Sequence, residues 1–355
     1  MSKVNRIRSA PGFSLIELLV VIGIIALVVA IIVPALGGAR IAAKKTATSQ
    51  LLTQITDASL QFSQDSGKMP GYFSPSEMGQ STNERQGFTG MENLLLDLIG
   101  GDAVVGRSGN AGSGDGVDVG PLSGGLSYNG KASNVKVDLN LLGKGDRVYL
   151  QNAQDYLQPT DGQEGTQAHR DFPDIVDAFG SPVLAWMEDP RGPREPTSLE
   201  EFATEDSDDD PAKFYWMSNA GWLQSDALGK IGRNQQTDSL LYDPGLAPET
   251  LSAVLGSPNF PIPNDLPDGT PLEDVRPGAS RGALVIHSAG ADGVYFATKD
   301  AGARAIGVDD PRNFLYGLNF FTSPPTQKRR TDSNGKITSI DVTSGFDDMI
   351  STAGN

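Results

Sequence analysis

A single carboxylate stands near the start of a long apolar stretch. Glu17 lies in the segment GFSLIELLVV, and no further charged residue follows it until Arg40. A charge at bilayer depth costs roughly 3 kcal/mol and is usually paired, yet no cation lies within one helical turn of Glu17. Cleavage between Gly12 and Phe13 would create an α-amino group four residues before Glu17. That ammonium could neutralise the carboxylate within one subunit or between neighbours.

These residues resemble the N-terminal signal of type IV pilins and type II secretion pseudopilins. A short basic leader ends in Gly12, the stretch Phe13-Ser-Leu-Ile-Glu17 follows it, and the apolar helix contains Pro34. The resemblance implies that a prepilin peptidase cleaves after Gly12 and methylates the new amine of Phe13. It also implies that Glu17 pairs with the amine of a neighbouring subunit during assembly, and that Pro34 belongs to the assembly helix.

The same apolar stretch has two simpler interpretations. The run from Leu18 to Leu36 provides about 19 apolar residues, enough for a single-pass membrane anchor, although an anchor leaves Glu17 unexplained. A secretory signal peptide has a shorter apolar region, so the run is too long for one. The three cations of the leader predict that the leader stays cytoplasmic and that the rest of the chain is exported.

Charge and composition limit the classes of function. The chain has 28 basic and 44 acidic residues, and removal of the leader's three cations leaves 25 basic against 44 acidic, a net charge of −19. Nucleic acid repels so acidic a body, so we expect no nucleic-acid partner. The absence of cysteine excludes disulfides, thiolate catalysis and thiolate metal sites.

Helical spacing continues beyond the apolar stretch. Six residues at this spacing place one mostly apolar stripe on the second half of the helix; they are Ile41, Thr48, Leu52, Ile55, Ser59 and Phe62. Gly67 and Pro70 are stop signals. The pattern predicts a single helix from 13 to 66, bent at Pro34 because proline removes a backbone donor. Two helices separated around Pro34 and the glycines at 37 and 38 remain the alternative.

The remaining chain predicts an exported α+β domain, with a long N-terminal helix packed on an antiparallel sheet. The predicted divisions are a leader at 1–12, a membrane and assembly helix at 13–36, its amphipathic continuation at 37–66, and the exported domain at 67–355. Long inserts are expected near 101–170 and 187–280.

Local signals place several elements within this domain. Thr89 is expected to cap a short amphipathic helix that ends near Ile99. The glycine-rich and serine-rich segment 102–130 predicts a loop. Asn334-Gly335 lies between alternating runs and predicts a hairpin.

Two later stretches resemble the major pseudopilins of type II secretion. The segment DAFGSPVLAW, from Asp177 to Trp186, is similar to the stretch that opens the sheet in those proteins. The segment SAGADG, from Ser288 to Gly293, is similar to a turn in which an aspartate and later acidic residues hold calcium. The resemblance implies that Asp292 is a calcium ligand, and calcium is the one cofactor we expect.

One aspartate is not enough for calcium, which takes about six to eight oxygen ligands. Three later aspartates could complete the shell together with backbone carbonyls; they are Asp300, Asp309 and Asp310. The sequence departs from the family here, since Lys299 and Arg304 would compete for the same carboxylates. A plain hairpin turn at Ala291-Asp292-Gly293 is the alternative.

The sequence does not predict an enzyme. It contains no nucleophile elbow, phosphate-binding glycine loop or zinc-protease helix. Its two histidines are His169, in a polar segment, and His287, on an apolar strand where a hydrogen-bonded core imidazole is the more frequent role.

We therefore expect a structural filament subunit. Its partners would be copies of itself and other pilins or pseudopilins, the prepilin peptidase and the inner-membrane assembly platform. The precursor would span the inner membrane once with its N-terminus in the cytoplasm, and the filament would be periplasmic or at the cell surface. The sequence leaves open whether the filament is a secretion pseudopilus or a type IV pilus. The rival interpretation is a membrane-anchored periplasmic binding protein that does not polymerise.

Overall fold

A computed structural model describes most of the chain. The described residues are 14–107, 116–121, 127–128, 131–132, 134–158, 172–204, 211–224, 238–241, 247–260, 265–267, 269–300, 315–322 and 328–354. The chain divides into two compact units, Met1–Thr46 and Ala47–Asn355. Helices and antiparallel sheets together make the fold α+β, as predicted.

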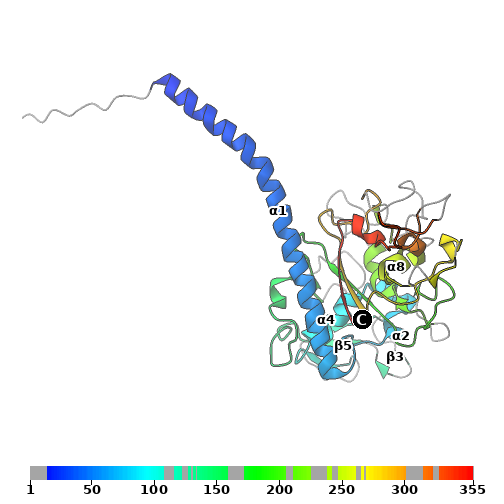
Figure 1. Cartoon of the computed structure of the whole chain (residues 1–355). Helices are drawn as coiled ribbons and strands as arrows, with labels where there is room; N and C mark the ends of the chain where they lie inside the picture. Colours follow the sequence, from blue (N-terminus) through cyan, green and yellow to red (C-terminus); the bar gives the residue numbers. More distant parts are fainter. Residues whose placement is uncertain are drawn as a thin grey trace, which may run out of the picture. The chain divides into compact units, whose positions relative to one another are not determined.

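The first helix, α1 (Leu15–Ser66), is continuous over 52 residues and passes through Pro34 (Figure 1). The alternative of two separate helices is therefore wrong. Within the first unit, the large apolar side chains from Leu15 to Leu36 are exposed, with exposed fractions from 45% to 81%. In a single subunit, these large apolar side chains are therefore not covered by the rest of their own unit.

The central sheet has three antiparallel strands in the order β12-β11-β8. They are β8 (Val183–Met187), β11 (Leu284–Ser288) and β12 (Met349–Ala353). The predicted turn before β8 is present, since Gly180 has a φ of 83° that favours glycine. The last strand of the chain is thus an edge strand that pairs with the middle strand β11.

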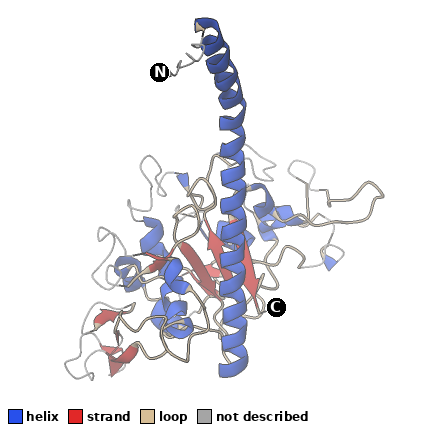
Figure 2. Ribbon diagram, turned by 90° about the vertical axis from the view of Figure 1, so that its left-hand side faces the viewer, coloured by secondary structure: helices blue, strands red, loops and turns tan. Residues whose placement is uncertain are grey.

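Alternate residues of the sheet face two different cores. Leu284 and Ile286 of β11 pack in the same core as Ile55 of α1, while Val285 packs on the opposite face in a core with Trp186. This period of two is the pattern of a strand covered on both sides. Figure 2 shows the second half of α1 in front of the central strands.

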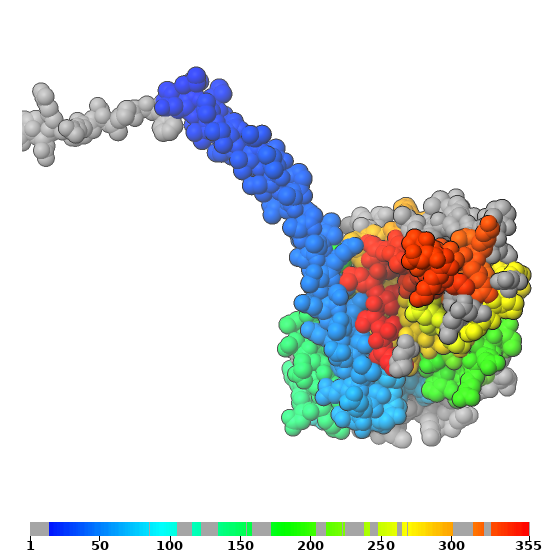
Figure 3. Space-filling model, viewed as in Figure 1, coloured from blue at the N-terminus to red at the C-terminus, as the bar shows by residue number. Residues whose placement is uncertain are grey.

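Five of the six residues of the predicted helical stripe are buried, all of them within the second unit, whereas Ile41 of the first unit is 49% exposed. Thr48, Leu52, Ile55, Ser59 and Phe62 are buried. The hydroxyls of Thr56 and Ser351 lie 2.8 Å apart and join α1 to β12, and Figure 3 shows the red C-terminal strand beside the blue helix. The compact body therefore includes the helix from Ala47 onward.

Five short helices of four to nine residues accompany the sheet in the described part of the chain. They are α2 (Pro75–Met78), α3 (Ser81–Gln86), α4 (Gly90–Leu98), α6 (Met217–Gln224) and α8 (Ala247–Leu255). Helix α4 is the one predicted from Thr89, whose hydroxyl accepts the Glu92 N–H in a capping box. Single 3-10 turns are η1 (Ala153–Asp155), η4 (Leu272–Asp274), η6 (Tyr316–Asn319) and η7 (Val342–Gly345).

Small sheets complete the described part of the chain. One contains β1 (Val104–Arg107), β5 (Val135–Val137) and β2 (Val117–Val119); pairs are formed by β3 (Ser127–Tyr128) with β4 (Lys131–Ala132), β6 (Leu157–Gln158) with β7 (Asp174–Ile175), and β9 (Ala203–Thr204) with β10 (Phe214–Tyr215). The prediction of a loop throughout 102–130 is therefore wrong, because β5 supplies a partner strand from beyond it. At Asn334-Gly335 the predicted turn is present, but a single bridge, Thr331 to Ile337, flanks it.

Candidate functional site

Three carboxylates meet just beyond the end of β11. The side chains of Asp292, Asp300 and Asp347 each offer an oxygen, and these oxygens all lie within 4.8 Å of one another. The structure thus brings Asp292 and Asp300 together as predicted. Asp309 and Asp310 lie outside the described residues.

Sequence reasoning missed Asp347. This residue directly precedes Asp348 and the strand β12, and the sheet order places the start of β12 beside the end of β11. The adjacent pair of aspartates just before a terminal strand was the available signal. Nothing in the local sequence connects that pair with a turn 55 residues earlier.

Backbone amides hold the Asp347 side chain in place. Its Oδ2 accepts hydrogen bonds from the N–H groups of Ala291 at 2.7 Å and Asp292 at 3.0 Å. Its Oδ1 is buried and has no hydrogen-bond partner within the described chain. A buried carboxylate oxygen without a partner is costly. A cation beside the three carboxylates would remove this cost, and the hard oxygen donors fit calcium.

The alternative of a plain hairpin at Ala291-Asp292-Gly293 is wrong. Both edges of β11 are already occupied, by β8 on one side and β12 on the other. The segment that follows this turn therefore finds no free edge of β11 with which it could form a hairpin. Gly290 and Gly293 have φ values of 68° and 76°, and they allow the chain to fold around the carboxylates.

The expected competition from Lys299 is not found. Its Nζ lies 3.8 Å from Asp238 Oδ2, and its side chain is 79% exposed. Lys299 therefore pairs away from the cluster. Arg304 lies outside the described residues.

Burial makes two members of the cluster, Asp292 and Asp347, resist ionisation. The pKa of Asp292 is raised to about 6, mainly by burial and in smaller part by the neighbouring carboxylates Asp347, Asp300 and Asp348, while a hydrogen bond from the Val294 N–H lowers it. Burial also raises the pKa of Asp347. Such a site favours a bound proton at mildly acidic pH, or a cation where the carboxylates are ionised.

Without divalent cations, the free energy of unfolding should fall as the pH rises from about 4 to about 6. The folded-state pKa of Asp292, about 6, exceeds its ordinary value of 3.8, so the folded state binds more protons in this interval. The stabilisation is complete below pH 3.8 and is lost as the pH rises through 6. Allowing for solvent screening, Asp292 contributes about 1 kcal/mol to this fall. Urea unfolding at a series of pH values measures it.

The control for this pH dependence is Asp292→Asn, which has no titrating carboxyl at the site and should show a shallower fall. The variant corrects for the many other acidic groups of the chain. Equal slopes in the two proteins would contradict the assignment. A bound cation would flatten the fall in the native sequence, because it stabilises the ionised carboxylates.

His287 has the core role that the sequence predicted. The Trp186 Nε1–H donates to His287 Nδ1 at 3.4 Å, and since tryptophan only donates, Nδ1 carries no proton. The Nε2–H then donates to Asp348 Oδ1 at 2.7 Å. The same carboxylate oxygen accepts the Phe296 N–H at 2.9 Å. This buried chain of hydrogen bonds joins β8, β11 and the start of β12. His169 lies outside the described residues.

The second site lies at the start of α1. The N–H and the hydroxyl of Ser14 both donate to Glu17 Oε2, each at 2.8 Å, and the Glu17 N–H donates to Ser14 Oγ at 3.2 Å. This reciprocal arrangement is a capping box. Glu17 therefore has hydrogen-bond partners in Ser14, which the search for a cation did not consider. The pattern Ser-x-x-Glu was present in the sequence.

Comparison with known proteins bears on this helix. The model of the prokaryotic N-terminal methylation motif matches residues 7–33. The chain carries the signature of type IV pilin and pseudopilin precursors. No curated protein and no solved structure matches the chain. The pilin-type signature contains Gly12, Phe13 and Glu17 and ends one residue before Pro34.

The pilin-type signature and helix α1 both fit a segment that crosses a membrane. Helix α1 is long and apolar enough near its start to cross a bilayer. Together with the motif, this fits a precursor anchored in the inner membrane. Gly12 and Phe13 lie outside the described residues, so the pairing of Glu17 with a Phe13 amine remains a prediction.

The capping box does not neutralise Glu17. Ser14 contributes one hydroxyl and one amide, both uncharged, so the carboxylate keeps its negative charge and gains only orientation. Glutamine at N3 can take the same place in a capping box. Helix capping and charge pairing at this residue can therefore be separated by experiment.

Proposed function

We propose that this chain is a structural subunit of a filament, either a type II secretion pseudopilus or a type IV pilus-like fibre. The observation that carries the proposal is the methylation motif at residues 7–33, on a helix whose apolar side chains are exposed in the single subunit. The precursor is cleaved after Gly12 and methylated on Phe13. Assembly then proceeds through α1, together with copies of the chain and other pilins or pseudopilins.

Glu17 supplies the selectivity of this assembly. Lipid tails are as apolar as leucine, so hydrophobic burial gives membrane helices little preference for one another. A carboxylate and an ammonium in a low dielectric attract strongly, and each is costly alone. Pairing of Glu17 with the amine of Phe13 in a neighbouring subunit therefore sets the register in which helices join.

The first experiment reads the N-terminus of the membrane-extracted protein by mass spectrometry. The expected polypeptide begins at Phe13 and carries a methyl group, because the peptidase creates the amine that Glu17 requires. A Gly12→Trp variant serves as the control, since the bulky side chain should block cleavage and leave the leader attached. A native protein that still starts with its basic leader would overturn the proposal.

Calcium is the proposed cofactor of the exported body. Asp292, Asp300 and Asp347 are the residues that would hold it. The support is the convergence of three carboxylates and the buried, unpaired Oδ1 of Asp347. A cation there would link the turn after β11 to the start of β12. Such a link could serve this cysteine-free chain as a disulfide serves others.

Within the class, the similarity of the two late segments to major pseudopilins favours the secretion pseudopilus. The length of the chain and its long inserts suit a minor subunit at the tip or a specialised surface pilin. The rival class, a membrane-anchored binding protein, is separated by one property. If the processed chain stays monomeric when its assembly platform is present, the result would support the membrane-anchored binding protein instead.

A further inference from the structure

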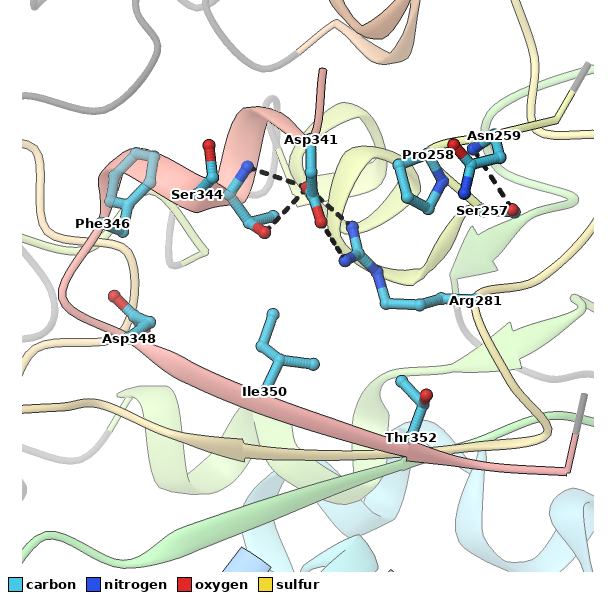
Figure 4. Close-up of a pocket in the computed structure, with 11 residues that line it drawn as sticks. Ser257, Pro258, Asn259, Arg281, Asp341, Ser344, Phe346, Asp348, Ile350 and Thr352 are labelled. Carbon is cyan, nitrogen blue, oxygen red and sulfur yellow. Dashed lines mark hydrogen bonds and ion pairs between the residues drawn. The ribbon is translucent and has the colours of Figure 1, made fainter. Parts of the chain in front are cut away.

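A pocket of about 440 Å³ lies on the face of β12 away from α1. Its floor is formed by Ile350 and Thr352, and its walls come from η7 and from the segment Ser257–Asn259 that follows α8 (Figure 4). Asn259 and Ser344 on the rim are exposed to solvent. The acidic cluster and the assembly helix contribute none of these residues, so neither of the sites described above explains the pocket.

One wall of the pocket is a fixed ion pair. Arg281 donates through Nη1 and Nη2 to the two carboxylate oxygens of Asp341. Arg281 Nε also donates to the Val254 carbonyl at 2.7 Å, and Asp341 Oδ1 accepts the Thr343 N–H at 3.0 Å. Although burial alone would raise it, hydrogen bonding and the charge of Arg281 lower the pKa of Asp341. The pair is therefore ionised, rigid and neutral in sum.

This wall presents a donor beside an acceptor. Guanidinium has five N–H groups, and the bonds to Asp341, Val254 and the Ala253 carbonyl leave one Nη1–H without a partner in the described chain. Among the described residues, Asp341 Oδ2 accepts from Nη1 alone. A hydroxyl group both accepts and donates, so one hydroxyl can satisfy both atoms at once. An ammonium group, which only donates, or a carboxylate, which only accepts, can satisfy only one of them.

Further uncommitted polar groups surround the same space. Within the described residues, Ser344 Oγ and Thr352 Oγ1 have no hydrogen-bond partner, and the amide nitrogen of Asn259 is likewise free, since only its Oδ1 is engaged, by Ser339. The apolar part consists of Ile350 and the Phe346 ring, which stacks edge-on against Phe296 at 5.1 Å. The pocket thus combines several hydrogen-bonding groups that suit hydroxyls with a small apolar surface.

Charge does not favour an ionic ligand. The Arg281–Asp341 pair cancels, and the Asp348 side chain is only 1% exposed and bonded to His287. A ligand that fits should be neutral, carry several hydroxyls in fixed positions, and present one apolar face. We propose that this pocket binds a pyranose sugar, as a free saccharide or as a unit of a longer glycan. The volume is ample for one ring and within the usual range of ligand sites.

The test is isothermal titration of the full chain, unassembled and held in a zwitterionic detergent that has no sugar headgroup. The probes are glucose, galactose, mannose and N-acetylglucosamine, each up to about 50 mM, with tetra-alanine as a neutral peptide probe. At least one sugar should bind with a Kd of roughly 1–10 mM, the range expected for a dozen ligand atoms. Binding of a longer oligosaccharide of the same sugar, tighter than the monosaccharide, would identify a glycan as the source.

Variants on the pocket rim locate the binding. Ser344→Ala and Asn259→Ala each remove one hydrogen-bonding group and should weaken binding roughly threefold to tenfold. Ser344→Trp should abolish it by filling the pocket. The matched control is Ser333→Ala, an exposed serine in the turn after Thr331. Circular dichroism checks that all four variants remain folded.

Three results would overturn the proposal: binding of none of the sugars, undiminished binding to Ser344→Trp, or binding of tetra-alanine in place of a sugar. The measurement uses unassembled protein, so it stands whether or not the chain forms filaments.

Discussion

Replacement of Glu17 by glutamine should abolish filament assembly while membrane insertion and leader cleavage continue. Glutamine preserves the capping box with Ser14 but removes the negative charge. Each Phe13 ammonium would then lie without a counter-ion in a low dielectric, at a cost of about 3–5 kcal/mol per subunit. This cost corresponds to a loss of more than about 100-fold in the association constant. Sedimentation of sheared filaments, with electron microscopy of the pellet, measures the result.

Two further variants separate the charge from the cap. Ser14→Ala removes the hydroxyl that bonds Glu17 and should cost the helix about 1 kcal/mol, yet leave assembly in place. Glu17→Ala removes the charge and the carboxylate half of the capping box, and it should fail to assemble like the glutamine variant. Normal filaments from Glu17→Gln would refute the charge-pairing mechanism. Loss of assembly in Ser14→Ala with normal cleavage would show that orientation by the cap matters as much.

Removal of calcium should lower the melting temperature of the full chain by about 6–16 °C. A cation at 100 to 1,000 times its Kd stabilises the folded state by about 3–4 kcal/mol, and each kcal/mol moves the midpoint of a body this large by about 2–4 °C. Differential scanning calorimetry in millimolar calcium and in excess chelator measures the difference. The full chain is required, because a fragment that starts at Ser66 would lose the buried α1 residues Leu51, Leu52 and Ile55.

Asp347→Asn is the variant that assigns this effect to the acidic cluster. It removes one of the three converging carboxylates and the charge of the unpaired Oδ1, so its melting temperature should barely respond to chelator. Asp57→Asn, at an exposed position of α1, is the matched control and should respond as the native chain does. An unchanged response in Asp347→Asn would place the calcium elsewhere. No response in the native chain would leave the carboxylates as a proton-binding cluster.

Several elements were predictable because their causes lie within a few residues. The Thr89 capping box, the glycine turn before β8 and the apolar stripe from Leu52 to Phe62 all depend on neighbours along one element. The strands β1 and β2 were missed for the opposite reason. Their pairing partner β5 lies beyond a glycine-rich segment, and a strand is stable only with the partner that completes its hydrogen bonds.

The candidate metal site divides in the same way. Asp292 and Asp300 were found in the sequence because both follow one turn, eight positions apart. Asp347 was not found, since it reaches Ala291 and Asp292 only after the chain has added its last strand beside β11.

The sequence by itself determined the pilin-type signature, the long helix and the capping box of Glu17, because each depends on residues that are close to one another along the chain. The tertiary structure alone decided that Asp347 completes the acidic cluster and that Arg281 and Asp341, 60 positions apart, share one pocket wall. The sheet order β12-β11-β8 is the physical reason. It places the end of the chain against a middle strand, and no local pattern records which strand will be the neighbour.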